Sequence, residues 1–148
     1  MPRPHIDVGA DEPRRALVRQ RLTESNTARA AVLRELEAIG ERHEAPLEVY
    51  ATDEAGELVG GLAGTTWASW LHVDRLWVAD DHRGAGLGRR LLHQAESVAR
   101  SERGCGHARV ETWSFQAPGF YLKQGYREVG IIEDYPPGEC EHLFVKDL

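Results

Sequence analysis

The stretch Val78-Ala79-Asp80-Asp81-His82-Arg83-Gly84-Ala85-Gly86-Leu87-Gly88-Arg89-Arg90-Leu91-Leu92 decides the fold. The apolar residues at 76–78 predict the end of a β-strand, and the polar residues at 80–82 predict a turn. Leucine, valine and alanine then recur at helical spacing from Leu87 to Ala99. A strand, a glycine-rich turn and a helix N-terminus form a general anion-binding arrangement. The first helical turn has free amide groups and the positive end of the helix dipole.

Three phosphate-binding patterns compete for this loop. A P-loop requires a lysine followed by serine or threonine, and the loop has neither. A dinucleotide-binding fingerprint requires Gly-x-Gly-x-x-Gly, whereas Gly88 comes one residue too early. The third pattern is Arg-x-x-Gly-x-Gly, which Arg83, Gly86 and Gly88 match. The structural alternative is a plain strand-to-helix turn that uses glycine for tight packing.

The third pattern resembles the acetyl-CoA pyrophosphate loop of the GNAT superfamily of N-acetyltransferases. The stretch at 114–126 is similar to a second GNAT signature, Asn-x-x-Ala-x-x-Phe/Leu-Tyr-x-x-x-Gly-Phe/Tyr. The matching positions are Ala117, Tyr121, Gly125 and Tyr126. Ser114 stands where the family often has asparagine. The resemblance covers roughly residues 47–148, and its details are similar to a subgroup of small bacterial GNAT proteins.

The resemblance implies an α/β (α+β) fold. We expect a single GNAT domain over residues 1–148, with a mixed, mostly antiparallel central sheet flanked by helices. The residue pattern predicts strands at 6–8, 47–52, 57–66, 70–78, 108–113, 126–132 and 141–146, and helices at 11–24, 27–38, 86–102 and from 118. The strands on either side of the 86–102 helix form a βαβ unit and should be parallel. In GNAT proteins these two strands splay apart, and the pantetheine arm enters the gap like an added strand.

The resemblance implies acetyl-CoA as the co-substrate. Backbone groups at 76–78 are expected to hold the pantetheine, and the glycine loop is expected to hold the pyrophosphate. The expected cofactor-binding residues are Leu76, Trp77, Val78, Arg83, Gly84, Ala85, Gly86, Leu87, Gly88, Arg89, Ser114 and Tyr121. We expect the side chain of Trp77 in the core. Trp67 and Trp70 are candidates to line an acceptor pocket, because aromatic faces suit cationic or apolar substrates.

Acetyl transfer to an amine requires a base for the amine proton and an acid for the leaving thiolate. Tyr121 is the candidate acid, because a phenol has a reference pKa near 10, close to that of a thiol. The alternative is that Tyr121 only packs. Glu111 and Asp74 are the candidate bases, and His72 shares one strand face with Asp74. The alternative for each is a polar strand residue that faces solvent, and some family members use no dedicated base.

Composition limits the other function classes. The chain has 148 residues, 41% of them hydrophobic and 28% charged, which is typical of one soluble globular domain. A net charge of −6 argues against a general nucleic-acid surface. The two cysteines form no CxxC motif, so no metal site is predicted. No signal peptide or membrane-spanning run is seen, so we expect a cytoplasmic protein that does not bind membranes.

The sequence therefore predicts an acetyl-CoA-dependent N-acetyltransferase. The expected acceptor is the primary amine of a small molecule, with a peptide or protein amine as the second choice, and the amine attacks the thioester directly. The second hypothesis is a catalytically inactive CoA-binding sensor or interaction module, which Ser114 and the unassigned base leave open. A homodimer is also considered.

Overall fold

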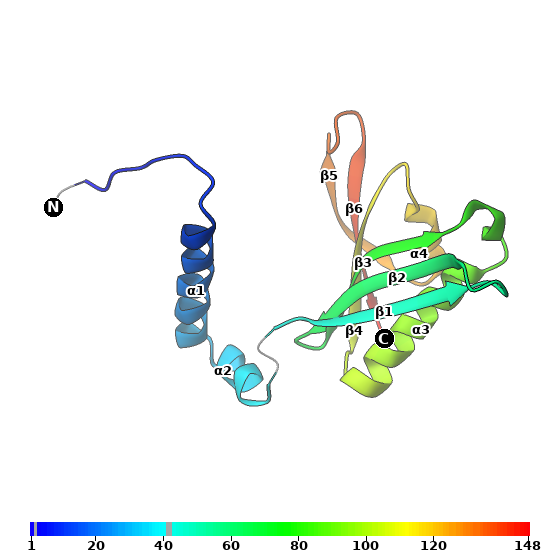
Figure 1. Ribbon diagram of the computed structural model, residues 1–148, viewed down its shortest axis with the longest axis horizontal. Coiled ribbons are helices and arrows are strands. Elements are labelled where there is room, and N and C mark those ends of the chain that lie inside the picture. The colour runs from blue at the N-terminus through cyan, green and yellow to red at the C-terminus, as the bar shows by residue number, and fades with distance from the viewer. Residues whose placement is uncertain (2, 41–42) are drawn as a thin grey trace. The chain divides into compact units, whose positions relative to one another are not determined.

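The computed structural model describes residues 1, 3–40 and 43–148 (Figure 1). The chain divides into two compact units, Met1–Arg42 and His43–Leu148. The first unit contains the helices α1 (Glu12–Arg29) and α2 (Ala31–Ala38). The second unit contains the sheet and the remaining helices. No helix in the described part of the chain is long and apolar enough to cross a membrane.

Helix α1 begins where the sequence predicts. Asp11 caps it by accepting a hydrogen bond from the Arg14 amide. The helix continues to Arg29, beyond the predicted end at 24, and the extended backbone of Ala30 separates it from α2. The predicted strand at 6–8 is wrong, since these residues are exposed and lack regular structure. An isolated short strand has no neighbour to satisfy its backbone hydrogen bonds.

The second unit is built on a six-stranded sheet in the order β1-β2-β3-β4-β6-β5. The strands are β1 (Ala45–Thr52), β2 (Leu58–Trp67), β3 (Trp70–Val78), β4 (His107–Trp113), β5 (Arg127–Glu133) and β6 (Cys140–Asp147). Only the β3–β4 pair is parallel; the other neighbours are antiparallel. This mixed sheet and its flanking helices confirm the predicted fold class.

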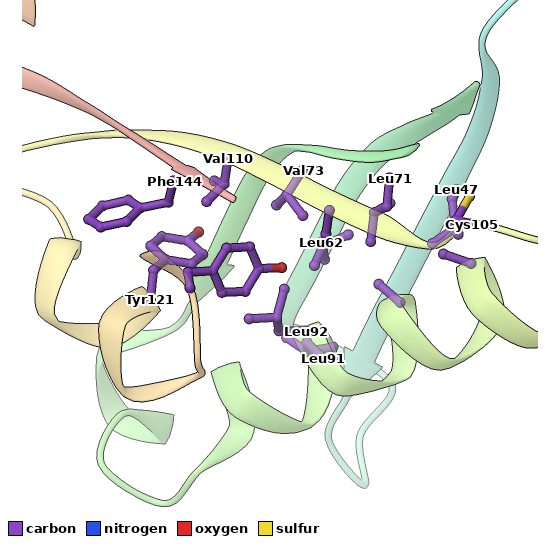
Figure 2. Packing of buried hydrophobic residues seen from close by; sticks show 14 residues of the cluster. Leu47, Leu62, Leu71, Val73, Leu91, Leu92, Cys105, Val110, Tyr121 and Phe144 are labelled. Carbon is purple, nitrogen blue, oxygen red and sulfur yellow. The ribbon is translucent and has the colours of Figure 1, made fainter. Parts of the chain in front are cut away.

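Helix α3 (Leu87–Arg103) covers one face of the sheet, and Figure 1 shows it running along β1, β2 and β3. Its buried face carries Leu91, Leu92, Ala95 and Ala99, which follow the i, i+4 spacing of one helix side. Gly104 ends the helix in the left-handed conformation. Figure 2 shows this face packing against leucines and valines of the strands, with Tyr121 and Phe144 extending the core beyond the helix.

The parallel pair splays apart as predicted. Pairing between β3 and β4 runs only from Trp70↔His107 to Val73↔Val110. Beyond this point β3 stays paired with β2 as far as Val78, whereas β4 pairs with β6 as far as Trp113. The segments 74–78 and 111–113 therefore diverge and leave a gap in the sheet.

A β-bulge lies where the strands begin to diverge. Ala63 pairs with Arg75 and Gly64 pairs with Val73, so Asp74 is the extra residue on β3. The bulge depends on Gly64, because a Cβ there would lie 2.3 Å from the carbonyl oxygen of His72. This close backbone approach accounts for the glycine at position 64 of β2.

Candidate active site

The glycine loop has the geometry of an anion site. Gly84 and Gly86 have φ values of +79° and +80°, which a residue with a Cβ rarely adopts. Gly86 opens α3, and no side chain of the described residues caps the helix by a hydrogen bond. Residues 83–86 are exposed, so the first-turn amides are left for an external acceptor. Gly88 is different, because a Cβ there would make only ordinary contacts with Val78 and Phe120.

The arginines of the loop fall into two groups, one bonded within the loop and one exposed to solvent. The Arg83 Nε donates to the Val78 carbonyl at 3.0 Å, and Arg83 Nη2 lies 3.0 Å from an Asp80 oxygen. Arg83 thus fastens the loop to the end of β3. Arg89 and Arg90 are exposed and form no ion pair with the described residues, so their charge is available to an anion. Ala85 and Leu87 complete the loop, and Leu87 packs on the core.

The end of β3 borders the gap in the sheet. Leu76 and Val78 pack against the core, whereas the Trp77 side chain is 49% exposed. The expectation that Trp77 is a core residue is therefore wrong. Strand alternation explains this, since Trp77 faces the side opposite to its two neighbours.

Four charged or titratable side chains converge where the strands diverge. His72 Nε2 lies 2.7 Å from Glu111 Oε2, and His72 Nδ1 lies 3.3 Å from Asp74 Oδ1. Arg109 approaches the same pair, with Nη2 3.3 Å from His72 Nδ1 and Nη1 3.4 Å from Glu111 Oε1. The structure therefore brings together both predicted bases and His72. The sequence reasoning missed Arg109, although its place two residues before Glu111 puts both on one face of β4.

A pocket of about 400 Å³ opens beside this cluster. Trp67 and Trp70 line it, as the sequence predicts, and Glu111 and His72 contribute polar groups. Trp70 is held by a ring stack on His107 at 4.7 Å. The remaining lining residues are Glu44, Thr65, Ala68, Arg109, Val110, Val129, Leu143, Phe144 and Val145. The sequence reasoning did not identify the β5 and β6 members, because their position depends on strand pairing far along the chain.

Tyr121 lies on α4 (Pro118–Lys123), and only 5% of its surface is exposed. Its ring packs against Tyr126 and Phe144, and Figure 2 shows it below Phe144 and Val110. Val110 and Phe144 also line the pocket, so Tyr121 lies directly behind the pocket wall. Its hydroxyl forms no hydrogen bond with the described residues. Burial raises the pKa of Tyr121 to about 12, so the hydroxyl keeps its proton at neutral pH.

Ser114 forms hydrogen bonds that connect two neighbouring strands. Its hydroxyl contacts the Glu139 carboxylate and accepts a hydrogen bond from the Cys140 amide at 3.1 Å. Its own amide donates to the Cys140 carbonyl at 2.8 Å. These bonds join the end of β4 to the start of β6. A role of Ser114 in cofactor binding stays a prediction.

Comparison with known proteins agrees with this geometry. A family model described as an acetyltransferase (GNAT) domain matches residues 45–128. A blasticidin-S acetyltransferase of Streptomyces morookaense is 53% identical over 131 residues, which cover 86% of this chain and 96% of that protein. A streptothricin acetyltransferase of Streptomyces lavendulae is 36% identical over 76 residues, 49% of this chain and 38% of that protein. The crystal structure of an acetyltransferase from Bacillus cereus has a TM-score of 0.83 at 32% identity and covers 98% of both chains.

These similarities reach beyond the fold. The family match includes the glycine loop, the splayed strands and Tyr121. The blasticidin-S acetyltransferase is similar along nearly its whole length. The chain belongs to the GNAT acetyltransferase family and is an acyl-CoA N-acyltransferase that uses acetyl-CoA.

Proposed function

We propose that this enzyme acetylates a primary amine of a small antibiotic, and that blasticidin-S is its first candidate acceptor. The observation that carries the proposal is the pocket beside the diverging strands. Its tryptophans offer flat apolar surfaces, and Glu44 and Glu111 offer negative charge to an ammonium group. The 53% identity to a blasticidin-S acetyltransferase supports the choice of acceptor.

Acetyl-CoA supplies the thioester that the amine attacks, and CoA leaves as the thiol. The amides at the start of α3, with Arg89, are proposed to hold the pyrophosphate. Backbone groups at 74–78 are proposed to hold the pantetheine arm, since this edge of β3 lacks a β4 partner.

Glu111 is the proposed general base. Its carboxylate lies on the pocket wall at the point where the gap begins, so it can reach both the acceptor and the thioester side. Asp74 and His72 support it from β3. Tyr121 is the proposed general acid, because its hydroxyl is free to donate and lies behind the same wall.

The test is an assay of thiol release from acetyl-CoA with the purified protein. Blasticidin-S is compared with streptothricin, a polyamine and a lysine-containing peptide. We expect the highest kcat/KM for blasticidin-S, with a product heavier by one acetyl group in mass spectrometry. Turnover of the peptide alone would contradict the proposed acceptor class.

A conservative substitution of Glu111 tests the proposed general base. Glu111→Gln keeps the size of the side chain but removes the base. We expect kcat to fall by about 10²-fold or more, while CoA affinity in calorimetry stays within a factor of two of the wild type. An unchanged kcat would exclude Glu111 as the base.

Three broader features are proposals as well. Residues 1–148 are proposed to act as one GNAT domain, although the chain divides into two compact units. A cytoplasmic location and a homodimer complete the proposal. Light scattering measures the mass in solution, and a mass of 16.5 kDa would exclude the dimer.

A further inference from the structure

His72 lies at the centre of the charged cluster on the open pocket wall. It is on β3, directly before the end of the β3–β4 pairing, and its side chain is 24% exposed. Among the residues that the structure describes, the charged or titratable groups that touch its ring come from β3 and β4: Asp74, Arg109 and Glu111. Glu44 lines the same pocket. On the other side of β3, Thr65 of β2 is the residue that pairs with His72.

The two nitrogens of His72 have different surroundings. Nε2 has one partner, Glu111 Oε2 at 2.7 Å, and a carboxylate can only accept. A proton on Nε2 therefore satisfies this contact. Nδ1 has two partners at 3.3 Å, the Arg109 guanidinium and the Asp74 carboxylate. The first can only donate, and the second can only accept.

These contacts supply a partner for both protonation states of His72. In the neutral ring, Nε2–H donates to Glu111 and Nδ1 accepts from Arg109. In the charged ring, Nε2–H keeps its bond to Glu111 and the Asp74 carboxylate, 3.3 Å from Nδ1, balances the positive charge. Protonation therefore exchanges Arg109 for Asp74 while the bond to Glu111 stays.

We propose that His72 is a positioning residue that holds the Glu111 carboxylate in the orientation needed for catalysis, with Arg109 as its partner when neutral and Asp74 as its partner when charged. The expected effect of His72 on catalysis rests on the proposed role of Glu111 as the base. The tautomer of His72 and its hydrogen-bond partners do not depend on that role, because they are properties of the free enzyme.

The first test is NMR of the histidine ring nitrogens in the full-length protein without ligands. We expect the neutral His72 ring to carry its proton on Nε2. Arg109→Leu removes the donor to Nδ1, so part of the neutral ring should move its proton to Nδ1, beside Asp74. Asp74→Leu should leave the proton of the neutral ring on Nε2. A neutral wild-type ring with its proton on Nδ1, or the same tautomer distribution in the two variants, would overturn the proposal.

The second test uses two substitutions of His72. His72→Gln retains an N–H donor but does not titrate, and His72→Phe removes the donor while keeping a planar ring. We expect His72→Phe to lower kcat by about tenfold to a hundredfold at an unchanged KM for acetyl-CoA, because a misplaced base loses this much. His72→Gln should recover most of the loss, because its side-chain amide can still donate to the Glu111 carboxylate.

The outcomes of the two tests separate the possible failures. Equal kcat values for His72→Phe and His72→Gln, with both proteins folded by circular dichroism, would overturn the positioning role. If no acceptor is turned over by the wild type, the proposed function fails, while the NMR result still decides the partners of His72.

Discussion

At the scale of single residues, Gly64 shows how a backbone contact shapes the site. A Cβ at this position would lie 2.3 Å from the His72 carbonyl oxygen and 3.3 Å from the Val73 Cα. Both are backbone atoms, which cannot move aside as a flexible side chain can. The bulge at Asp74 and the place of His72 therefore depend on this glycine.

Gly64→Ala should lower the free energy of unfolding by about 1–3 kcal/mol, the usual cost of forcing an atom into a packed interior. Chemical denaturation measures the change. Gly106→Ala is the matched control, since a Cβ there would meet no atom within 4 Å. Equal stability of the two variants would contradict the steric argument.

Tyr121→Phe removes one hydroxyl from a buried residue whose ring contacts those of Phe120, Tyr126 and Phe144. Because the ring stays, the core and the affinity for CoA should change little. Without the proton donor for the leaving thiolate, kcat should fall by about 10²-fold. Steady-state kinetics and calorimetry with CoA check the two parts, and an unchanged kcat would leave Tyr121 with a packing role only.

Tyr121 also predicts how stability depends on pH. Burial raises its pKa to about 12, so the fold favours the neutral phenol. The contribution is complete below the unfolded-state pKa of about 10 and is lost as the pH rises toward the folded-state value. A shift of this size corresponds to about 3 kcal/mol. The unfolding free energy of the wild type should therefore fall more steeply between pH 10 and pH 12 than that of Tyr121→Phe, as urea denaturation would show.

At the scale of elements, helix α3 has the same glycine conformation at both of its ends. Gly86 at the start has a φ of +80°, and Gly104 at the end has a φ of +65°. A Cβ would meet no atom within 4 Å at either position. An alanine at either end thus brings a similar backbone strain of about 1 kcal/mol. Only the first end is proposed to bind the pyrophosphate.

Gly86→Ala should therefore weaken CoA binding by about tenfold, because the strained loop no longer holds its amides toward the phosphates. Gly104→Ala should leave the affinity within a factor of two while losing a similar amount of stability. Calorimetry with CoA and thermal denaturation measure both quantities. Equal affinities in the two variants would place the pyrophosphate elsewhere.

The sequence predicts the positions of individual helices and strands better than it predicts the contacts between them. The strand at 70–78 forms with the predicted bounds, and the 86–102 helix forms within one residue, because periodicity and glycine stops are local signals. The parallel pair follows from the βαβ rule. The contact between Arg109 and His72 was not predictable, because it depends on the register of β3 against β4. Trp77 was placed wrongly for a related reason, since alternation alone does not say which face is covered.

At the scale of the whole second unit, one buried charged group joins three elements. Glu96 on α3 is only 9% exposed. One of its oxygens accepts from the Tyr126 hydroxyl at 3.0 Å, and the other accepts from Lys146 Nζ on β6 at 2.9 Å. Lys146 also lies 5.5 Å from the centre of the Tyr126 ring. The helix, the chain entering β5 and strand β6 are thus tied together next to Tyr121, whose ring packs against that of Tyr126.

Lys146→Met should be strongly destabilising, by about 3–5 kcal/mol, because it leaves the Glu96 carboxylate buried without its cation. Adding Glu96→Gln should recover a large part of this loss. The amide keeps an acceptor for the Tyr126 hydroxyl and no longer carries a charge. Chemical denaturation of the wild type, both single variants and the double variant gives the coupling energy, which we expect to be about 1–3 kcal/mol. Additive losses would mean that the ion pair does not hold the three elements together, and that apolar packing around Phe144 does so alone.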